Sequence, residues 1–428
     1  MAGDLLVWGL LIKKFKIFIM RKNILLIMCF IGGVFRLEAK VHYVNLHARG
    51  NNDGTTWANA YTDLQTAMIA ASGGDSVFVA TATYQPAIGI SFSLPGSAKV
   101  FGGFIGTETS FNQRNLTNKA TLLGNGASVV RNENNPAAGV WDGFIITGGD
   151  DFMCGGINNI SSAVTIRNCI ISGNSASMGG GIHNYVYSSP TIINCVISGN
   201  KGSGLYNNVN CSPTVINCTF AGNSGGIFNR YGSASTVINC IVWDNPVGAH
   251  GNNIVSDGMS SATVTYSDVQ DVTAGTGNIS VDPQFVAPGI GAVPFSGGDY
   301  RLQPGSPVID AGSNVANKLT TDLGGNPRIR SSAIEMGAFE NTLVSKIVYV
   351  DSSIAVSGDG SSWAKAYKTL SDALKSASVD FTTVDSILVA KGLIIRPDSK
   401  MLLTETAPFS SCEVVSKFMA DTPLVEVH

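Results

Sequence analysis

The chain has 428 residues, of which 13% are charged and 44% are hydrophobic, and its formal net charge is −3. This balance excludes the basic surface that nucleic-acid binding requires, and it excludes a charged tail. The hydrophobic fraction is sufficient for a core, so the composition also argues against intrinsic disorder.

Residues 1–39 have the layout of a secretory signal peptide. Arg21 and Lys22 form a basic region, and the apolar stretch 24–34 that follows is too short to span a bilayer. The sequence "LEA" then gives a cleavage site after Ala39. We therefore expect the mature chain to be secreted or held at the cell surface, without a membrane span.

The signal layout begins at Met20, so we expect translation to start there. The alternative is a membrane anchor over residues 5–35. That anchor is disfavoured by five positive charges in its middle, at Lys13, Lys14, Lys16, Arg21 and Lys22.

Residues 40–136 are predicted to form an N-terminal cap and the first coils of a repeat structure. The strand "VHYVN" and the loop "NNDGTTWANAY" precede an amphipathic helix near 61–72, and the strands "DSVFVA" and "AKVFGGF" follow. Repeat structures built from strands need such a cap, because their terminal coils otherwise expose unpaired strand edges.

Residues 137–280 contain a repeat, seen as "TIRNC" (165–169), "TIINC" (191–195) and "TVINC" (214–218 and 236–240). If each Cys is position zero, "WDGFIITGG" and "TYSDVQD" fit the same frame with Gly143 and Ser267 at zero, and the spacing is 22 to 27 residues. Positions −3 and +2 are always apolar. They are Val140, Ile166, Ile192, Val215, Val237 and Val264, and Ile145, Ile171, Ile197, Phe220, Val242 and Val269.

Position −1 of the repeat is predicted to be a corner of the chain. Side chains alternate along a strand, so positions −3, 0 and +2 can all face inward only if the backbone turns between them. Asn and Asp tolerate the left-handed conformation of such a turn. They occupy position −1 as Asp142, Asn168, Asn194, Asn217 and Asn239. Position −2, which varies from Trp141 to Thr265, is expected to face outward.

A period of this length, made of short strands, predicts an all-β fold, a right-handed parallel β-helix whose cap holds one short helix. Stacked coils should align Asn168, Asn194, Asn217 and Asn239 in a hydrogen-bonded ladder, and Cys169, Cys195, Cys218 and Cys240 in a buried column. Neighbouring in-register strands give poor disulfide geometry, so we expect free thiols. A linear column also cannot surround a metal tetrahedrally, so no metal site is expected there.

Each coil begins with a second repeated motif, which should stack into another ladder. It reads "GGIN", "GGIHN", "GLYN" and "GGIFN" in successive coils. Its aliphatic residues should face inward, which leaves an aromatic stripe outside. We define this outer stripe as His183, Tyr206 and Phe228, flanked by Arg230 and Tyr231. Stacked rings could bind the faces of sugar rings, or they could only shield the sheet.

Residues 281–341 form an irregular C-terminal closing segment, with "LQPGSPVIDAGSN", "TDLGGNPRI" and "IEMGAFE". These motifs closely resemble the C-terminal segment of secreted bacterial choice-of-anchor Q β-helix proteins, and the N-terminal cap is similar to theirs. The coils resemble the pectate-lyase-like superfamily. The resemblance covers roughly residues 41–341 and implies export, with polysaccharide as the usual partner class, but it implies no particular activity.

Residues 346–392 repeat the cap, with Trp363 in the place of Trp57 and Tyr367 in the place of Tyr61. The parallel stops at Leu393. One base added after Gly392 lets the shifted frame encode "TYYP" and "IKIYGGYPAG", which match "TYQP" and "AKVFGGFIG" of the first cap. We therefore interpret 393–428 as a frameshifted tail of a truncated second β-helix.

Residues suited to catalysis are few. Lyases on this fold use Ca²⁺ with an Arg or Lys base, and glycosidases use close carboxylates. The weak candidates are Asp150, Asp151, Asp268 and Asp271, with His250 as an isolated histidine. The Asp-Gly loops "NNDG" and "SGDG" could hold calcium, but Asp-Gly is first a turn signal, so no cofactor is expected.

Two functional classes remain. The favoured interpretation is an exported or cell-surface β-helix protein that is monomeric and non-catalytic, and that binds glycan or another surface. The alternative is a polysaccharide lyase or glycoside hydrolase. Convergence of the four candidate aspartates within about 10 Å would favour the enzyme.

Overall fold

The computed structural model describes residues 39–135, 138–246, 253–272, 274–330, 332–342, 346–379, 384–390 and 413–416. Residues Met1–Lys40 form a unit separate from Val41–His428. The predicted signal peptide, His250 and most of the tail 393–428 therefore lie outside the described residues. No helix in the described part is long and apolar enough to cross a membrane.

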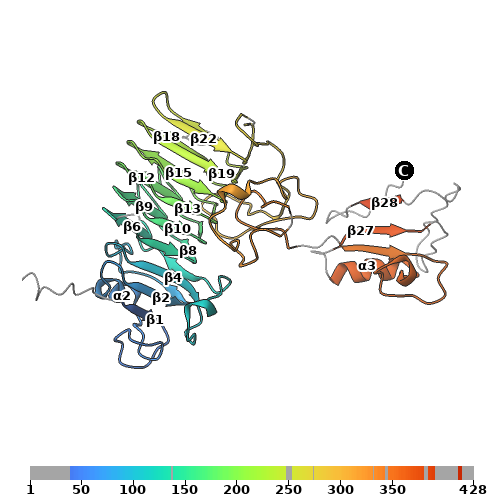
Figure 1. The fold of residues 1–428 in the computed structure, drawn as a ribbon, viewed down its shortest axis with the longest axis horizontal. Coiled ribbons are helices and arrows are strands. Elements are labelled where there is room, and N and C mark those ends of the chain that lie inside the picture. Colours follow the sequence, from blue (N-terminus) through green and yellow to red (C-terminus); the bar gives the residue numbers. More distant parts are fainter. Residues whose placement is uncertain are drawn as a thin grey trace, which may run out of the picture. The chain divides into compact units, whose positions relative to one another are not determined.

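Short parallel strands stack in chain order into three sheets (Figure 1). Sheet A has nine strands: β1 (Val41–Val44), β2 (Ser76–Ala80), β4 (Lys99–Phe104), β7 (Val140–Asp142), β10 (Thr165–Arg167), β13 (Thr191–Ile193), β16 (Thr214–Ile216), β19 (Ala234–Ile238) and β22 (Ser261–Thr265). Sheet B has eight: β3 (Thr83–Tyr84), β5 (Ala120–Leu123), β8 (Phe144–Thr147), β11 (Ile170–Ser172), β14 (Val196–Ser198), β17 (Thr219–Ala221), β20 (Ile241–Trp243) and β23 (Asp268–Val269).

Sheet C has six strands: β6 (Val130–Glu133), β9 (Ile157–Ile160), β12 (Ile182–Tyr185), β15 (Ser203–Asn208), β18 (Gly225–Arg230) and β21 (Ile254–Ser256). From β4 to β21 each coil contributes one strand to each sheet, and equivalent residues of successive coils pair in register, as Ile192 does with Val215 and Val215 with Val237. The predicted all-β parallel β-helix is confirmed.

The core is a set of aligned columns of apolar side chains. The four repeat cysteines are fully buried in it, none is in a disulfide, and the backbone N–H of Cys218 donates to Sγ of Cys240 at 3.4 Å. Burial raises the pKa of the thiols of Cys169, Cys195 and Cys218. They therefore act as small apolar groups.

The corner between sheets A and B has left-handed backbone at Asn168, Asn194, Asn217 and Asn239, with φ between 50° and 54°. The first coil departs from the predicted frame by one residue. Gly143, with φ of 85°, takes the corner, because Arg167 pairs with Asp142. Trp141 consequently faces inward and is fully buried, and the prediction that it faces outward is wrong.

The corner asparagines form only part of the predicted ladder. Nδ2 of Asn194 donates to Oδ1 of Asn168 at 3.4 Å, and Nδ2 of Asn168 donates to Asp142, but Asn217 has no side-chain hydrogen bond among the described residues. The bonded ladders lie inside the coils instead. One runs through Asn132, Asn159, Asn184, Asn207 and Asn229, and the other through Asn174, Asn200, Asn223, Asn245 and Asn253, with spacings of 2.7 to 3.1 Å. The corner side chains point outward, where Asn194 and Asn239 bond to later backbone.

The N-terminal cap contains α2 (Leu64–Ala70), shorter than the predicted 61–72 because Asp63 caps it by accepting from the N–H of Thr66. A 3₁₀ turn at Phe111–Gln113 follows β4. In the second cap, β26 (Lys346–Val350), α3 (Leu370–Val379) and β27 (Val384–Val389) repeat the order of β1, α2 and β2, and a 3₁₀ turn at Trp363–Lys365 lies between β26 and α3.

The two caps share their turn geometry as well as their elements. Tyr43 packs edge-on against Trp57 at 4.8 Å between centroids, and Tyr349 does so against Trp363 at 4.9 Å. The third strand differs. β4 pairs parallel with β2, whereas β28 (Glu413–Ser416) pairs antiparallel with β27.

The closing segment contains β24 (Phe285–Ala287), β25 (Asp299–Leu302) and a 3₁₀ turn at Asn314–Ala316. It lies along the outer face of sheet B (Figure 1, orange beside green). Its core residues Phe285, Tyr300, Leu302, Val308, Leu323, Met336 and Ala338 cluster with Val196, Ala221 and Ile241 of that sheet. The outer face of sheet B and the closing segment therefore enclose a second hydrophobic core.

Candidate functional site

The outer stripe does not have the exposure expected of a ligand-facing surface. His183 and Tyr206 are fully buried, Phe228 is half-buried, and their ring centroids are 5.5 and 5.3 Å apart. Arg230 lies over the ring of Tyr231, which is 44% exposed. The expected exposure is therefore wrong for His183 and Tyr206, and only the edge of the stripe reaches solvent.

Two loops bury His183. Ser177 and Gly179 donate backbone hydrogen bonds to Phe152 and Met153 of the preceding coil, and a Cβ on Gly179 would lie 2.8 Å from that of His183. Burial lowers the pKa of His183 to about 4, so this imidazole is neutral at physiological pH.

The four candidate aspartates do not converge. Asp150 and Asp151 follow β8, whereas Asp268 begins β23, five strands further along sheet B. Five spacings amount to about 24 Å, well beyond the ~10 Å that paired catalytic carboxylates require. Among the described residues, no group of His, Cys, Asp and Glu is arranged to hold a metal ion.

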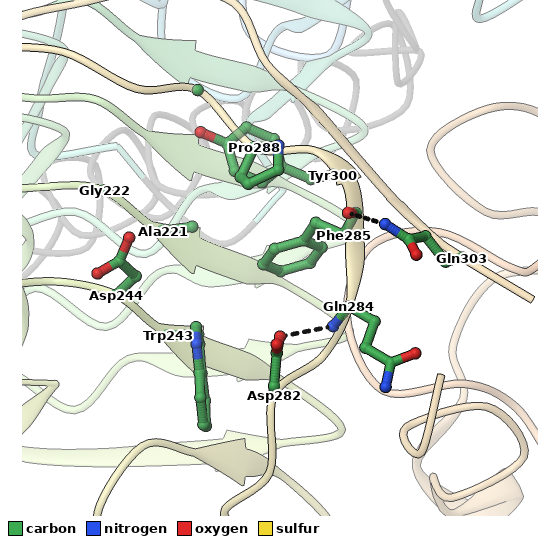
Figure 2. Close-up of a pocket in the computed structure, with 11 residues that line it drawn as sticks. Ala221, Gly222, Trp243, Asp244, Asp282, Gln284, Phe285, Pro288, Tyr300 and Gln303 are labelled. Carbon is green, nitrogen blue, oxygen red and sulfur yellow. Dashed lines mark hydrogen bonds between the residues drawn. The ribbon is translucent and has the colours of Figure 1, made fainter. Parts of the chain in front are cut away.

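A pocket of about 220 Å³ lies between sheet B and the closing segment (Figure 2). The sheet supplies Ala221, Gly222, Trp243 and Asp244, and the closing segment supplies Asp282, Gln284, Phe285, Pro288, Gly289, Tyr300 and Gln303. This volume is below the ~300–1,000 Å³ typical of drug-sized ligands, so it suits a single ring-sized group.

The pocket opens where the repeat changes. The turn after sheet B is "SGN" at 172–174 and 198–200, "AGN" at 221–223 and "WDN" at 243–245. The middle residue has positive φ in all four coils, with Asp244 at 52°. Asp tolerates that conformation as Asn does, so the change from glycine keeps the turn and adds a carboxylate to it. This change is visible in the sequence but lies outside the Asn-Cys motif from which the repeat was predicted.

Hydrogen bonds within the closing segment hold two polar side chains of the pocket in place. The N–H of Gln284 donates to Oδ1 of Asp282 at 2.9 Å, and Nε2 of Gln303 donates to the carbonyl of Phe285 at 2.9 Å (Figure 2). Tyr300 is 4% exposed, and its hydroxyl has no hydrogen-bond partner among the described residues. Burial raises the pKa of Tyr300, so its hydroxyl stays protonated and can donate.

Gly199 and Gly222 occupy the position of Asp244 in the two preceding coils, and both contact the loop beside the pocket. Phe295 donates its N–H to the carbonyl of Gly199 at 2.8 Å, and its ring approaches within 3.0 Å of the Cβ position of Gly222. Any side chain at Gly199 or Gly222 would displace that ring. Because Gly199 and Gly222 have no side chain, loop 287–298 can pack closely against these turns beside the pocket.

A buried ion pair fixes the rest of the closing segment. Nη1 of Arg328 lies 3.3 Å from Oε1 of Glu340, both side chains being fully buried, and Nη2 donates to the carbonyl of Gly337 at 2.6 Å. Gly337 and Ala338 in turn donate to Asn239 and Thr219 of the coils. Burial lowers the pKa of Arg328 to about 10, which leaves it charged at neutral pH.

Asp268 lies behind the pocket in the column that holds Ile241 in the preceding coil. It is fully buried, Oδ1 accepts from the N–H of Val281, and Oδ2 has no partner among the described residues. Burial, with a smaller contribution from the charge of Asp282, raises the pKa of Asp268 to about 7.

A comparison with protein-family models supports the fold. A family model described as "Right handed beta helix region" matches residues 115–279. Among solved structures, one titled "Crystal structure of pectate lyase Pel9A" matches with 16% identity and a TM-score of 0.35, covering 71% of this chain and 96% of that chain. A comparison with curated proteins finds no match.

Proposed function

We propose that this chain is an exported, non-catalytic β-helix protein that binds a glycan in the pocket beside Trp243. The observation that carries the proposal is the change from Ser-Gly or Ala-Gly to Trp-Asp at residues 243–244, which line the pocket together with Ala221 and Gly222 of the preceding coil. An aromatic ring with adjacent carboxylates and amides suits a sugar, because the ring packs on the C–H face while the polar groups accept from hydroxyls.

Export rests on the signal-like residues 1–39, and cell-surface localisation follows from the resemblance of the two end segments. Within the outer stripe, Phe228, Arg230 and Tyr231 stay candidate contacts, but His183 and Tyr206 are too deeply buried to touch a ligand. We therefore favour the pocket over the stripe as the binding site.

A glycoside hydrolase is the alternative, and one observation favours it: Asp244 and Asp282 line the same pocket. If the pair were catalytic, glycan incubated with the protein would release reducing ends, and Asp282→Asn would abolish the release. The binding proposal instead predicts that glycan binds without release of reducing ends, and that its affinity depends on Trp243.

The proposal is tested with an immobilised glycan panel. We expect Trp243→Ala to lose retention on every glycan that retains the wild type. Tyr187→Ala is the matched control, because Tyr187 is a 67% exposed aromatic residue after sheet C, away from the pocket. Tyr231→Ala tests the stripe. Equal retention of wild type and Trp243→Ala, or loss only in Tyr231→Ala, would reject the pocket as the site.

A further inference from the structure

The described lining of the pocket carries negative charge and no positive charge. Asp244 and Asp282 contribute two exposed carboxylates, and no Lys, Arg or His is among the lining residues. Arg301, which neighbours Tyr300 in the chain, is paired with Asp299, with Nε 2.9 Å from Oδ1. The pocket therefore has no described cation that could neutralise an acidic ligand.

We propose that the pocket selects a cationic amino sugar, with a free ammonium group, over neutral sugars and against uronic acids. This inference rests on the proposed function and names its ligand class. An ammonium group between Asp244 and Asp282 gains charge-assisted hydrogen bonds, whereas a uronate there is repelled by both.

The aromatic wall favours the same ligand. Trp243 precedes Asp244 in the chain and lines the same pocket as Asp244 and Asp282 (Figure 2). An indole face attracts cations, so it adds to the attraction of the carboxylates rather than opposing it.

The site can be altered without disturbing its fold. Asn is found at positive φ in the other corners, so Asp244→Asn keeps the backbone and removes only the charge. Asp282→Asn retains an oxygen that can accept from the N–H of Gln284. Asp150→Asn is the control, because it removes an exposed charge near β8, four strands of sheet B away from the strand that precedes Asp244.

The experiment is calorimetric titration with three oligosaccharides of equal length, composed of glucosamine, N-acetylglucosamine or galacturonic acid. We expect glucosamine to bind at least ~10-fold more tightly than N-acetylglucosamine, and galacturonic acid to be the weakest. Asp244→Asn and Asp282→Asn should each reduce this preference, and Asp150→Asn should retain it. Raising ionic strength from about 0.01 M to about 1 M should also reduce it, because the Debye length falls from ~30 to ~3 Å.

The outcomes separate the two proposals. If N-acetylglucosamine or galacturonic acid binds as tightly as glucosamine, or if Asp150→Asn weakens the preference as much as Asp244→Asn, the amino-sugar inference is wrong and glycan binding stands. If none of the three binds and the wider glycan panel is also negative, both proposals fail.

Discussion

The inner asparagine ladders should contribute more to stability than the corner asparagines. Asn200 is fully buried and its side chain makes four hydrogen bonds: Nδ2 donates to Asn223 Oδ1 at 2.8 Å and to the carbonyl of Ile171 at 2.9 Å, and Oδ1 accepts from N and Nδ2 of Asn174 at 3.1 and 3.0 Å. Asn200→Ala removes all four and leaves the buried N–H of Asn174 without its partner. At about 1 kcal/mol for each bond, the four lost bonds cost about 4 kcal/mol, and the orphaned N–H adds to this.

Asn217→Ala is the control. Its φ is 52°, its side chain is buried, and that side chain has no hydrogen bond among the described residues. We expect a cost of about 1–2 kcal/mol, from the left-handed backbone alone. Urea unfolding followed by circular dichroism measures both variants. If Asn217→Ala is as destabilising as Asn200→Ala, the assignment of stability to the inner ladder is wrong.

Three further predictions concern single buried groups. Asn194→Leu should cost about 1–3 kcal/mol in the same assay, because Nδ2 donates to the carbonyl of Thr321; an unchanged melting temperature would contradict this. The His183 pKa of about 4 lies below the unfolded value of 6.5, so the unfolded state binds more protons between these values. Stability should then fall by up to about 3 kcal/mol as pH drops through that window, and His183→Phe should flatten the slope. The Asp268 pKa of about 7 lies above the unfolded 3.8, so its buried carboxyl destabilises the fold as pH rises through that interval. Asp268→Asn should therefore be about 2–4 kcal/mol more stable than wild type at pH 8, with an advantage that disappears near pH 4, and equal melting temperatures at pH 8 would count against this assignment.

The sequence predicts the coils because stacking makes equivalent residues repeat. The Asn-Cys phrase indicates both the left-handed corner and the buried thiol, and the strands that pair in register follow from it. The first coil is misaligned by one residue because glycine fits the corner as well as Asn does. Gly143 was therefore assigned to the cysteine position when it occupies the corner.

The candidate site was harder to predict, since it depends on contacts between segments far apart in sequence. The burial of His183 requires loops from two coils to fold over sheet C. The pocket requires residues 282–303 to return across sheet B. A departure from the repeat, such as Trp243-Asp244 in the place of Ser-Gly, is visible in the sequence, but its partners are not.

The central claim is that a glycan binds beside Trp243. The most direct measurement is the NMR signal of each tryptophan indole N–H during titration with a glycan that the panel shows to be retained, with Trp243→Phe used for assignment. Trp141 and Trp57 are internal references, because their indole N–H groups donate to Asn132 and to the carbonyl of Glu108. The account predicts a saturable shift of the Trp243 signal while the Trp141 and Trp57 signals stay fixed. A glycan that binds without moving the Trp243 signal would contradict it.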